Sequence, residues 1–223
     1  MSSKAQIQYS GPEEQSLMAR MWSPEIKDNP YNFVMFAFPW GKVGTPLEKF
    51  KGPRKWQKEL LLDLDEHIRV NKNLVVQALM TTLFQGATSS GRGIGKSSVV
   101  ACLNLWMQAC HLGSTCVNTA NTEDQLKNKT WAELGKWHTM SINSHWFDRT
   151  ILSLRPATWF EDLLKDKKLL IDTAYYYAQA LTWSEEKPDA FAGVHNMIGM
   201  LLIFDEASGI PKPIWTVSEG FFT

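Results

Sequence analysis

Apolar side chains follow two patterns along this chain, helical spacing and short continuous runs. Helical spacing begins after Pro53 and again at Ser97, and a capping box from Thr122 to Gln125 opens a third helical stretch. The short apolar runs predict strands at residues 115–120, 151–154, 169–173, 175–183 and 198–204. Strands that alternate with amphipathic helices favour an α/β fold with a mostly parallel sheet. We expect some of the middle strands to form an antiparallel edge.

The pattern separates a short N-terminal part from a longer α/β part. Residues 1–32 are polar and interrupted by prolines, which predicts an arm rather than an element of the core. Residues 32–40 are apolar and aromatic, and the prolines and glycines after them predict a buried segment that enters a loop. The helix that begins at Ser97 is apolar on nearly all sides, so we expect it to lie buried against the sheet. We therefore place an N-terminal arm and lid segment at residues 1–50 and the main domain at residues 51–223.

Composition argues against a membrane protein and against a disulfide-stabilised one. Among the 223 residues no uninterrupted apolar run approaches the roughly 18 residues of a membrane span. The three cysteines, Cys102, Cys110 and Cys116, are odd in number and lack the spacing of a zinc site, which favours a reducing compartment. The five histidines also lack the spacing of metal ligands.

The overall charge gives no indication of nucleic-acid binding. Lys and Arg together number 23, and so do Asp and Glu, so the formal net charge is zero. Any contact with DNA must therefore be local. We expect the ten tryptophans mainly to fill the core rather than to stack on bases.

A glycine-rich segment at residues 90–98, here called the phosphate loop, resembles the sites that hold nucleotide phosphates. Its glycines lack the Cβ atoms that would keep a polyanion away from backbone N–H groups. Lys96 is placed to meet the β- and γ-phosphates of ATP, and Ser97 is placed to offer its hydroxyl to Mg²⁺. The motif is a variant, because Ser90 stands where it has its first glycine. The residues expected to hold the nucleotide here are Ser90, Gly91, Gly93, Ile94, Gly95, Lys96, Ser97 and Ser98.

An acidic pair, Asp205 and Glu206, follows the apolar run 201–204 and supplies the other half of an ATPase site. Hydrolysis of ATP requires a metal that bridges the β- and γ-phosphate oxygens and a water held in line for attack. We expect Asp205 to hold Mg²⁺ together with Ser97. Glu206 is the candidate general base that accepts the proton of the attacking water.

Three further residues are candidates for nucleotide contacts. Arg92, inside the phosphate loop, is placed to reach the γ-phosphate and to stabilise charge in the transition state, or it is a solvated side chain at a loop tip. Gln57 has an amide that can pair with the adenine edge, and the ring of Trp56 can cover the base. The alternative for Trp56 is an ordinary core position.

Several segments together resemble the large subunit of the terminase of tailed bacteriophages, in its N-terminal ATPase region. They are residues 36–41, 52–57, 90–97, 119–126, 129–134, 191–196 and 204–208. The resemblance implies a P-loop NTPase fold of the additional-strand, RecA-like type. It makes Trp56 and Gln57 the adenine-recognition motif and Arg92 the loop arginine. It also makes residues 119–126 similar to the helicase-type motif Ia, which lies near the DNA-facing side in related motors.

The same resemblance implies what the protein does. Terminases use ATP and Mg²⁺ to drive double-stranded DNA into an empty prohead. They form a homo-oligomeric ring on the portal protein, and a small terminase subunit selects the DNA. They act in the host cytoplasm, at the portal, and are not part of the mature virion.

The sequence departs from this family in two places. Many terminases supply a trans-acting arginine shortly before the acidic strand, but residues 185–200 contain none, which leaves Lys187 or the earlier Arg155 as substitutes. The sequence also ends at Thr223, where the family continues into a coupling strand and a nuclease domain. That strand would lie between the strand before the phosphate loop and the strand before Asp205, so we expect an incomplete sheet.

Two other functions fit the same motifs. Another helicase-like, DNA-dependent ATPase would share the phosphate loop, the acidic pair and the motif-Ia-like segment. An inactive nucleotide-binding fragment, with a role in assembly, would bind ATP and scarcely hydrolyse it.

Overall fold

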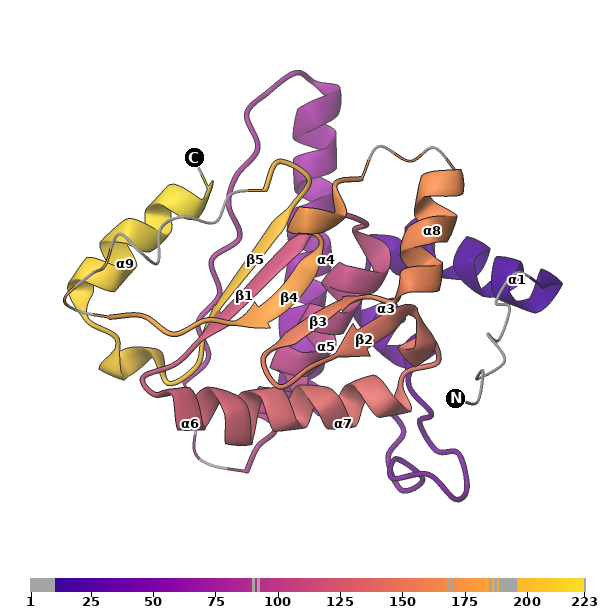
Figure 1. Cartoon of the computed structure of the whole chain (residues 1–223), viewed down its shortest axis with the longest axis horizontal. Helices are drawn as coiled ribbons and strands as arrows, with labels where there is room; N and C mark the ends of the chain where they lie inside the picture. Colours follow the sequence, from indigo (N-terminus) through magenta and orange to yellow (C-terminus); the bar gives the residue numbers. More distant parts are fainter. Residues whose placement is uncertain are drawn as a thin grey trace, which may run out of the picture.

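The sheet of the computed structural model contains five strands, in the order β2–β3–β4–β1–β5 (Figure 1). The structure describes residues 11–89, 91, 93–167, 169, 171–184, 186, 188 and 196–222. Within them the strands are β1 (Thr115–Thr119), β2 (Phe147–Arg149), β3 (Ser153–Pro156), β4 (Tyr177–Ala180) and β5 (Met200–Phe204).

The pairing divides the sheet into a parallel and an antiparallel part. Strand β1 lies between β4 and β5 and is parallel to both, with Thr115 opposite Met200 and Thr119 opposite Phe204. Strands β2 and β3 are antiparallel to each other, and β3 is antiparallel to β4. The mixed α/β class and the antiparallel edge predicted from the sequence are therefore confirmed.

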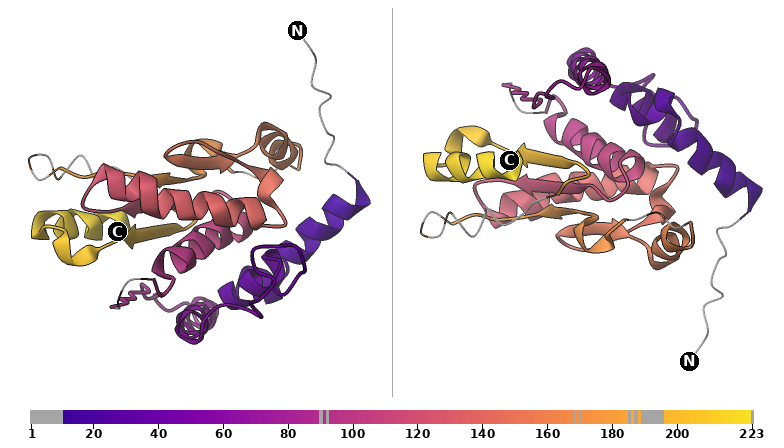
Figure 2. Two further views of the ribbon diagram at one scale, coloured as in Figure 1. Left: turned by 90° about the horizontal axis from the view of Figure 1, so that it is seen from below. Right: turned by 90° about the horizontal axis from the view of Figure 1, so that it is seen from above.

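Helices flank this sheet. The α-helices are α1 (Pro12–Met21), α2 (Pro24–Lys27), α3 (Pro30–Ala37), α4 (Lys55–Val76), α5 (Lys96–Cys110), α6 (Glu123–Gln125), α7 (Ala132–Met140), α8 (Thr158–Asp166) and α9 (Lys212–Glu219). A π-helix (Leu126–Trp131) joins α6 to α7, and short 3₁₀ turns occupy Ser144–Trp146, Thr173–Tyr175, Ala207–Gly209 and Gly220–Phe222. Figure 2 shows α5 between the sheet and the layer that α1–α4 form. None of these helices is both long enough and apolar enough to cross a membrane.

Helix α5 forms the centre of the core, as its pattern predicts. Its side chains from Ala101 to Cys110 are mostly buried. The helix runs antiparallel to β1, and two of its polar side chains contact that strand. The amides of Asn104 and Asn118 donate to each other at 2.8 Å, and Gln108 reaches Cys116 at 3.5 Å. Four tryptophans are buried in the core, as expected from the sequence: Trp106, Trp131, Trp137 and Trp146.

From residue 11 onward the N-terminal segment packs on the core and is not a polar arm, whereas residues 1–10 of the predicted arm lie outside the described residues. Met21 and Phe33 are fully buried, and the indole of Trp22 donates to the carbonyl oxygen of Ala109 on α5 at 3.0 Å. In return, the indole of Trp106 donates to the carbonyl oxygen of Lys27 at 2.9 Å. The sequence pattern failed here because each of these helices is short and buries only a few side chains, which gives no sustained period.

Two predicted strands are absent from the sheet that the structure describes. One is the strand expected before the phosphate loop: residues 79–89, which precede the loop, form no strand, and Met80 is 92% exposed. The edge strand β5 does not pair with them, and an extended segment without a backbone partner is not stable as a strand. The described residues of the other run, 169 and 171–173, form no strand and lead into the turn Thr173–Tyr175.

Candidate active site

The chain direction brings the phosphate loop and the acidic pair to the same end of the sheet. Helix α5 begins at Lys96, so the last residues of the phosphate loop form its first turn; the helix runs antiparallel to β1, which places that turn at the carboxyl end of β1. Asp205 comes directly after β5 at that same end, and its N–H donates to the carbonyl oxygen of Thr119 at 2.8 Å. Leu201 packs into the core on the α5 side, and strand alternation places Asp205 on that side too.

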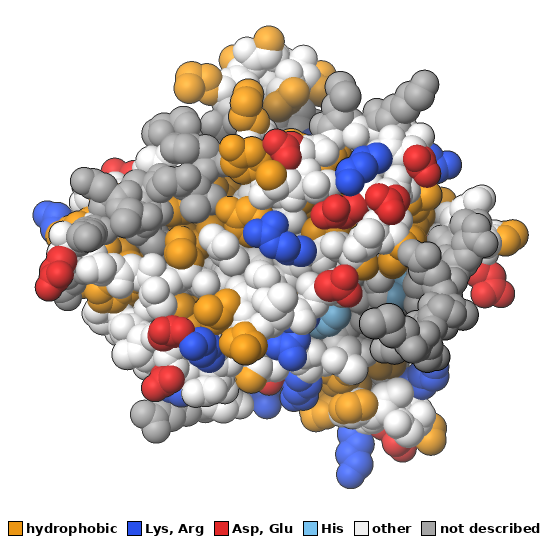
Figure 3. Space-filling view, in the orientation of Figure 1, with side chains coloured by type: hydrophobic (Ala, Val, Ile, Leu, Met, Phe, Trp, Pro, Cys, Tyr) orange, Lys and Arg blue, Asp and Glu red, His pale blue; other side chains and the backbone are white. Residues whose placement is uncertain are grey.

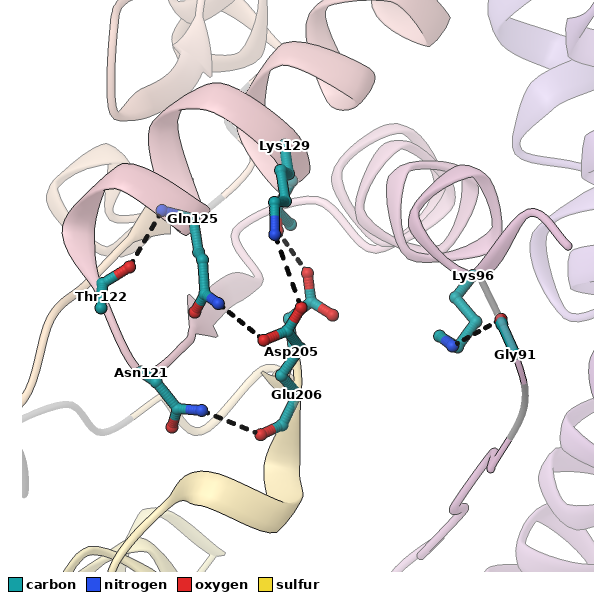
Figure 4. Close-up of polar contacts among 9 residues, drawn as sticks. Gly91, Lys96, Asn121, Thr122, Gln125, Lys129, Asp205 and Glu206 are labelled. Carbon is teal, nitrogen blue, oxygen red and sulfur yellow. Dashed lines mark hydrogen bonds and ion pairs between the residues drawn. The ribbon is translucent and has the colours of Figure 1, made fainter. Parts of the chain in front are cut away.

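The described part of the phosphate loop has a backbone that favours glycine. Gly93 has φ of 74° and Gly95 has φ of 90°, both in the region that other residues rarely adopt. The ammonium of Lys96 donates to the carbonyl oxygen of Gly91 at 3.1 Å (Figure 4). A Cβ atom on Gly91 or Gly93 would meet nothing within 4 Å, so this backbone is accessible. Ser90 and Arg92 lie outside the described residues.

Gln57 and Trp56, the predicted adenine-recognition pair, contact the phosphate loop itself. Gln57 is only 6% exposed, and its Nε2 donates to the carbonyl oxygen of Gly95 at 2.7 Å and to Oγ of Ser98 at 2.9 Å. Its Oε1 accepts from the N–H of Arg54 at 2.8 Å. The indole of Trp56 donates to the carbonyl oxygen of Ile94 at 3.1 Å. Both residues therefore brace the loop, a role that sequence reasoning missed.

The cavity next to Gln57 is too small for a base. Val34, Trp40, Gln57 and Ser98 are among the residues that line it, and its volume is about 10 Å³. That space holds about one water molecule. Recognition of adenine by Gln57 would require the amide to leave Gly95 and Ser98, and it stays a prediction.

The predicted magnesium ligands, Ser97 and Asp205, lie at the same end of the sheet, and both offer the oxygen atoms that magnesium prefers. Ser97 lies in the first turn of α5, and Oδ2 of Asp205 accepts a hydrogen bond from the hydroxyl of Thr130 at 2.6 Å. Among the described residues no group of three or more His, Cys, Asp or Glu side chains is arranged to hold a metal. Magnesium in nucleotide sites commonly has one or two protein ligands, with phosphates and waters completing the shell, so two oxygens fit.

Glu206 is held by three polar side chains that follow β1 (Figure 4). Its Oε2 accepts from Nε2 of Gln125 at 2.6 Å, and its Oε1 lies 3.6 Å from the ammonium of Lys129. Its carbonyl oxygen accepts from Nδ2 of Asn121 at 3.3 Å. Glu206 has φ of 56° and ψ of 45°, a left-handed conformation that is uncommon outside glycine. In this structure the candidate base is therefore bonded to protein and not directed at the phosphate loop.

The π-helix explains how neighbouring residues reach both acids. Thr122 caps α6 by accepting from the N–H of Gln125 at 3.2 Å, which is one half of the predicted capping box; the side chain of Gln125 bonds Glu206 and not the N–H of Thr122. The wider turn from Leu126 to Trp131 then lets Lys129 reach Glu206 while the adjacent Thr130 reaches Asp205. Sequence reasoning predicted an ordinary helix here, because no residue pattern marks a π-turn. Such turns occur often at functional sites.

Of the two candidates for a trans-acting cation, the structure describes only Arg155, which lies away from the acidic pair. The guanidinium of Arg155, on β3, lies 4.8 Å from the centre of the Tyr177 ring. Strands β4 and β1 separate β3 from β5, so Arg155 is about 14 Å from the Asp205 strand at the usual strand spacing. Lys187 is outside the described residues.

Comparison with known proteins adds no relative. A scan against protein-family models finds no match, and searches of curated proteins and of solved structures find none either.

Proposed function

We propose that this chain is the ATP-hydrolysing module of a phage terminase large subunit, which drives double-stranded DNA into a prohead. The observation that carries the proposal is the common location of the phosphate loop and the acidic pair. The loop leads into the first turn of α5 and the pair follows β5, and both lie at the carboxyl end of the parallel strands. Ligands of α/β proteins bind at that end of the sheet.

Each side chain of the site has a distinct role in this proposal. Magnesium-bound ATP would supply the phosphoanhydride bond and the metal charge that assists its cleavage. Lys96 binds the β- and γ-phosphates, and Ser97 and Asp205 hold the ion. Glu206 turns from Gln125 and Lys129 to accept the proton of the attacking water. Arg92 and the backbone N–H groups of the loop stabilise charge on the transferred phosphoryl group.

The partners follow from the terminase proposal. They are double-stranded DNA, the portal protein and the small terminase subunit, with a homo-oligomeric ring as the working form. The place of action is the prohead portal in the host cytoplasm. Under this proposal residues 51–223 form the P-loop ATPase domain, and the nuclease activity of terminases belongs to a separate domain.

Phosphate release from ATP tests the proposal. The purified 223-residue chain is assayed with Mg²⁺, with and without duplex DNA, beside Lys96→Ala, Glu206→Gln and the surface control Lys165→Ala. We expect the two site variants to lose at least about 100-fold in turnover, as for other removals of transition-state contacts. The control should match the parent chain. Equal background in all four proteins would refute an ATPase.

An inactive nucleotide-binding fragment is the second candidate. The bonds from Gln125 and Lys129 to Glu206 favour it, because they occupy the carboxylate that would accept the proton. So does the lack of strand pairing at residues 79–89. Thermal stabilisation by ATP without phosphate release would support this candidate. ATP-dependent strand unwinding would instead favour another helicase-like ATPase.

A further inference from the structure

An open groove lies between α7 and the outer strand of the antiparallel edge, away from the phosphate loop. Its volume is about 730 Å³, and the residues that line it include Lys127, Asn128, Lys136, Arg149 and Thr150. No carboxylate is among the described residues that line it. Figure 3 shows Lys and Arg side chains gathered over α7 on the lower part of this face. A chain with zero net charge thus concentrates three cations in one groove.

The absence of a side chain on Gly135 leaves the space that the guanidinium of Arg149 occupies in the groove. A Cβ atom built on Gly135 would lie 2.6 Å from Cζ of Arg149 and 2.9 Å from its Nε and Nη1. The guanidinium therefore lies directly against the backbone of α7, where only glycine leaves room for it. Asp148 precedes Arg149 on β2, and strand alternation directs its carboxylate to the opposite face.

The lysines of the groove have partners that a phosphate can replace. Lys127 pairs with Glu123, and Lys136 lies 3.6 Å from Glu133. Both pairs are partly exposed and lie within about one helical turn, and such pairs contribute only about 0.2–0.5 kcal/mol each. Arg149 makes no ion pair within the described part of the chain, and its planar donors suit phosphate oxygens.

We propose that this groove binds the phosphodiester backbone of double-stranded DNA. The cations that line the groove support a site for a polyanion. That the polyanion is DNA rests on the proposed packaging function. The contacts are to phosphates and not to base edges, so binding should be independent of sequence and sensitive to salt.

Fluorescence anisotropy of a labelled 30-base-pair duplex tests the proposal at several salt concentrations. The proteins are the intact chain, Arg149→Ala, the triple variant Lys127→Ala/Lys136→Ala/Arg149→Ala, and the control Arg69→Ala. Arg69 is exposed on α4 and pairs with Glu66, so it matches Arg149 in charge but lies outside the groove. We expect Arg149→Ala to weaken binding and to reduce the slope of log affinity against log salt by about 1, and the triple variant by about 2–3. Gly135→Ala should weaken binding as well, because it displaces the guanidinium and keeps its charge.

Binding of a fluorescent ATP analogue to the same proteins separates the two proposals. Loss of DNA binding in the groove variants, with ATP binding unchanged, supports the groove. Equal DNA affinity and equal salt slope in the intact chain and the triple variant overturn it, whatever the ATP result. Failure of the intact chain to bind the duplex also overturns it. If the chain binds DNA through the groove and does not bind ATP, the groove stands and the ATPase proposal fails.

Discussion

The side-chain amide of Gln57 donates to the carbonyl oxygen of Gly95 at 2.7 Å, and this bond ties the start of α4 to the start of α5. The same nitrogen reaches Oγ of Ser98, while Oε1 accepts from the N–H of Arg54. The phosphate loop is thus positioned by a buried amide 38 residues earlier in the chain. A loop that must present N–H groups to a polyanion benefits from a fixed backbone, since preorganised donors need no rearrangement.

This arrangement predicts how Gln57→Ala changes the affinities for ATP and GTP. Removal of the amide leaves buried polar groups unpaired, so we expect a loss of about 1–3 kcal/mol in the free energy of unfolding. Because the amide holds the loop and not a base in this structure, affinities for ATP and GTP should fall by the same factor. Equilibrium binding of fluorescent analogues of both nucleotides measures this. A selective loss of ATP would show instead that Gln57 recognises adenine.

Two glycines of the loop should differ sharply in their tolerance of alanine. A Cβ atom on Gly95 would lie 2.7 Å from Nε2 of Gln57, and φ there is 90°. Gly91 has no positive φ, and a Cβ atom on it would meet nothing within 4 Å. We expect Gly95→Ala to destabilise the fold by at least about 1–2 kcal/mol, and Gly91→Ala to change stability by less than about 0.5 kcal/mol. Urea unfolding monitored by tryptophan fluorescence checks both, and equal midpoints would contradict the loop geometry.

The contacts of Glu206 predict that its restraint limits turnover. Lys129→Ala and Gln125→Ala each remove one partner of the Glu206 carboxylate, so the side chain can turn toward the phosphate loop more often. We expect basal ATP hydrolysis to rise severalfold in each variant and further in the double variant. The increase should vanish when Glu206→Gln is added, because the base is then absent. Unchanged or lower turnover in the double variant would mean that these bonds position Glu206 for catalysis.

Sequence patterns were most reliable for the two elements that flank the candidate site. The apolar pattern predicted helix α5 and the strand before Asp205, the glycine motif and the acidic pair predicted the site residues, and the structure places both segments at one end of the sheet. Periodicity failed where structure depends on distant contacts. The strand expected before the phosphate loop lacks a neighbour to pair with, and the N-terminal helices bury Met21 and part of Trp22 only because they pack against α5. The bonds from Gln57 to the phosphate loop and from Thr130 to Asp205 are tertiary contacts between segments, which local patterns do not encode.

His111 predicts how the stability of the chain changes in mild acid. Burial, reinforced by the nearby charge of Lys27, lowers the pKa of His111 from 6.5 to about 4. The ring packs edge-on against Trp106 at 4.7 Å, and its Nε2 has no hydrogen-bond partner among the described residues. The unfolded chain therefore binds a proton below about pH 6.5 that the folded chain accepts only near pH 4, so stability is lost as the pH falls through that window.

The shift corresponds to about 3 kcal/mol between pH 7 and pH 4. In His111→Gln the amide can still donate to the neighbouring backbone of Lys27 but cannot be protonated, so its free energy of unfolding should fall less over the same window. Urea denaturation at pH 7.5, 6.5, 5.5 and 4.5 measures the difference between the two proteins. Burial also lowers the pKa of His138. Its effect on the free energy of unfolding is the same in both proteins and therefore cancels in the difference between them. Parallel curves for the parent chain and the variant would show that His111 is accessible to protons in the folded state.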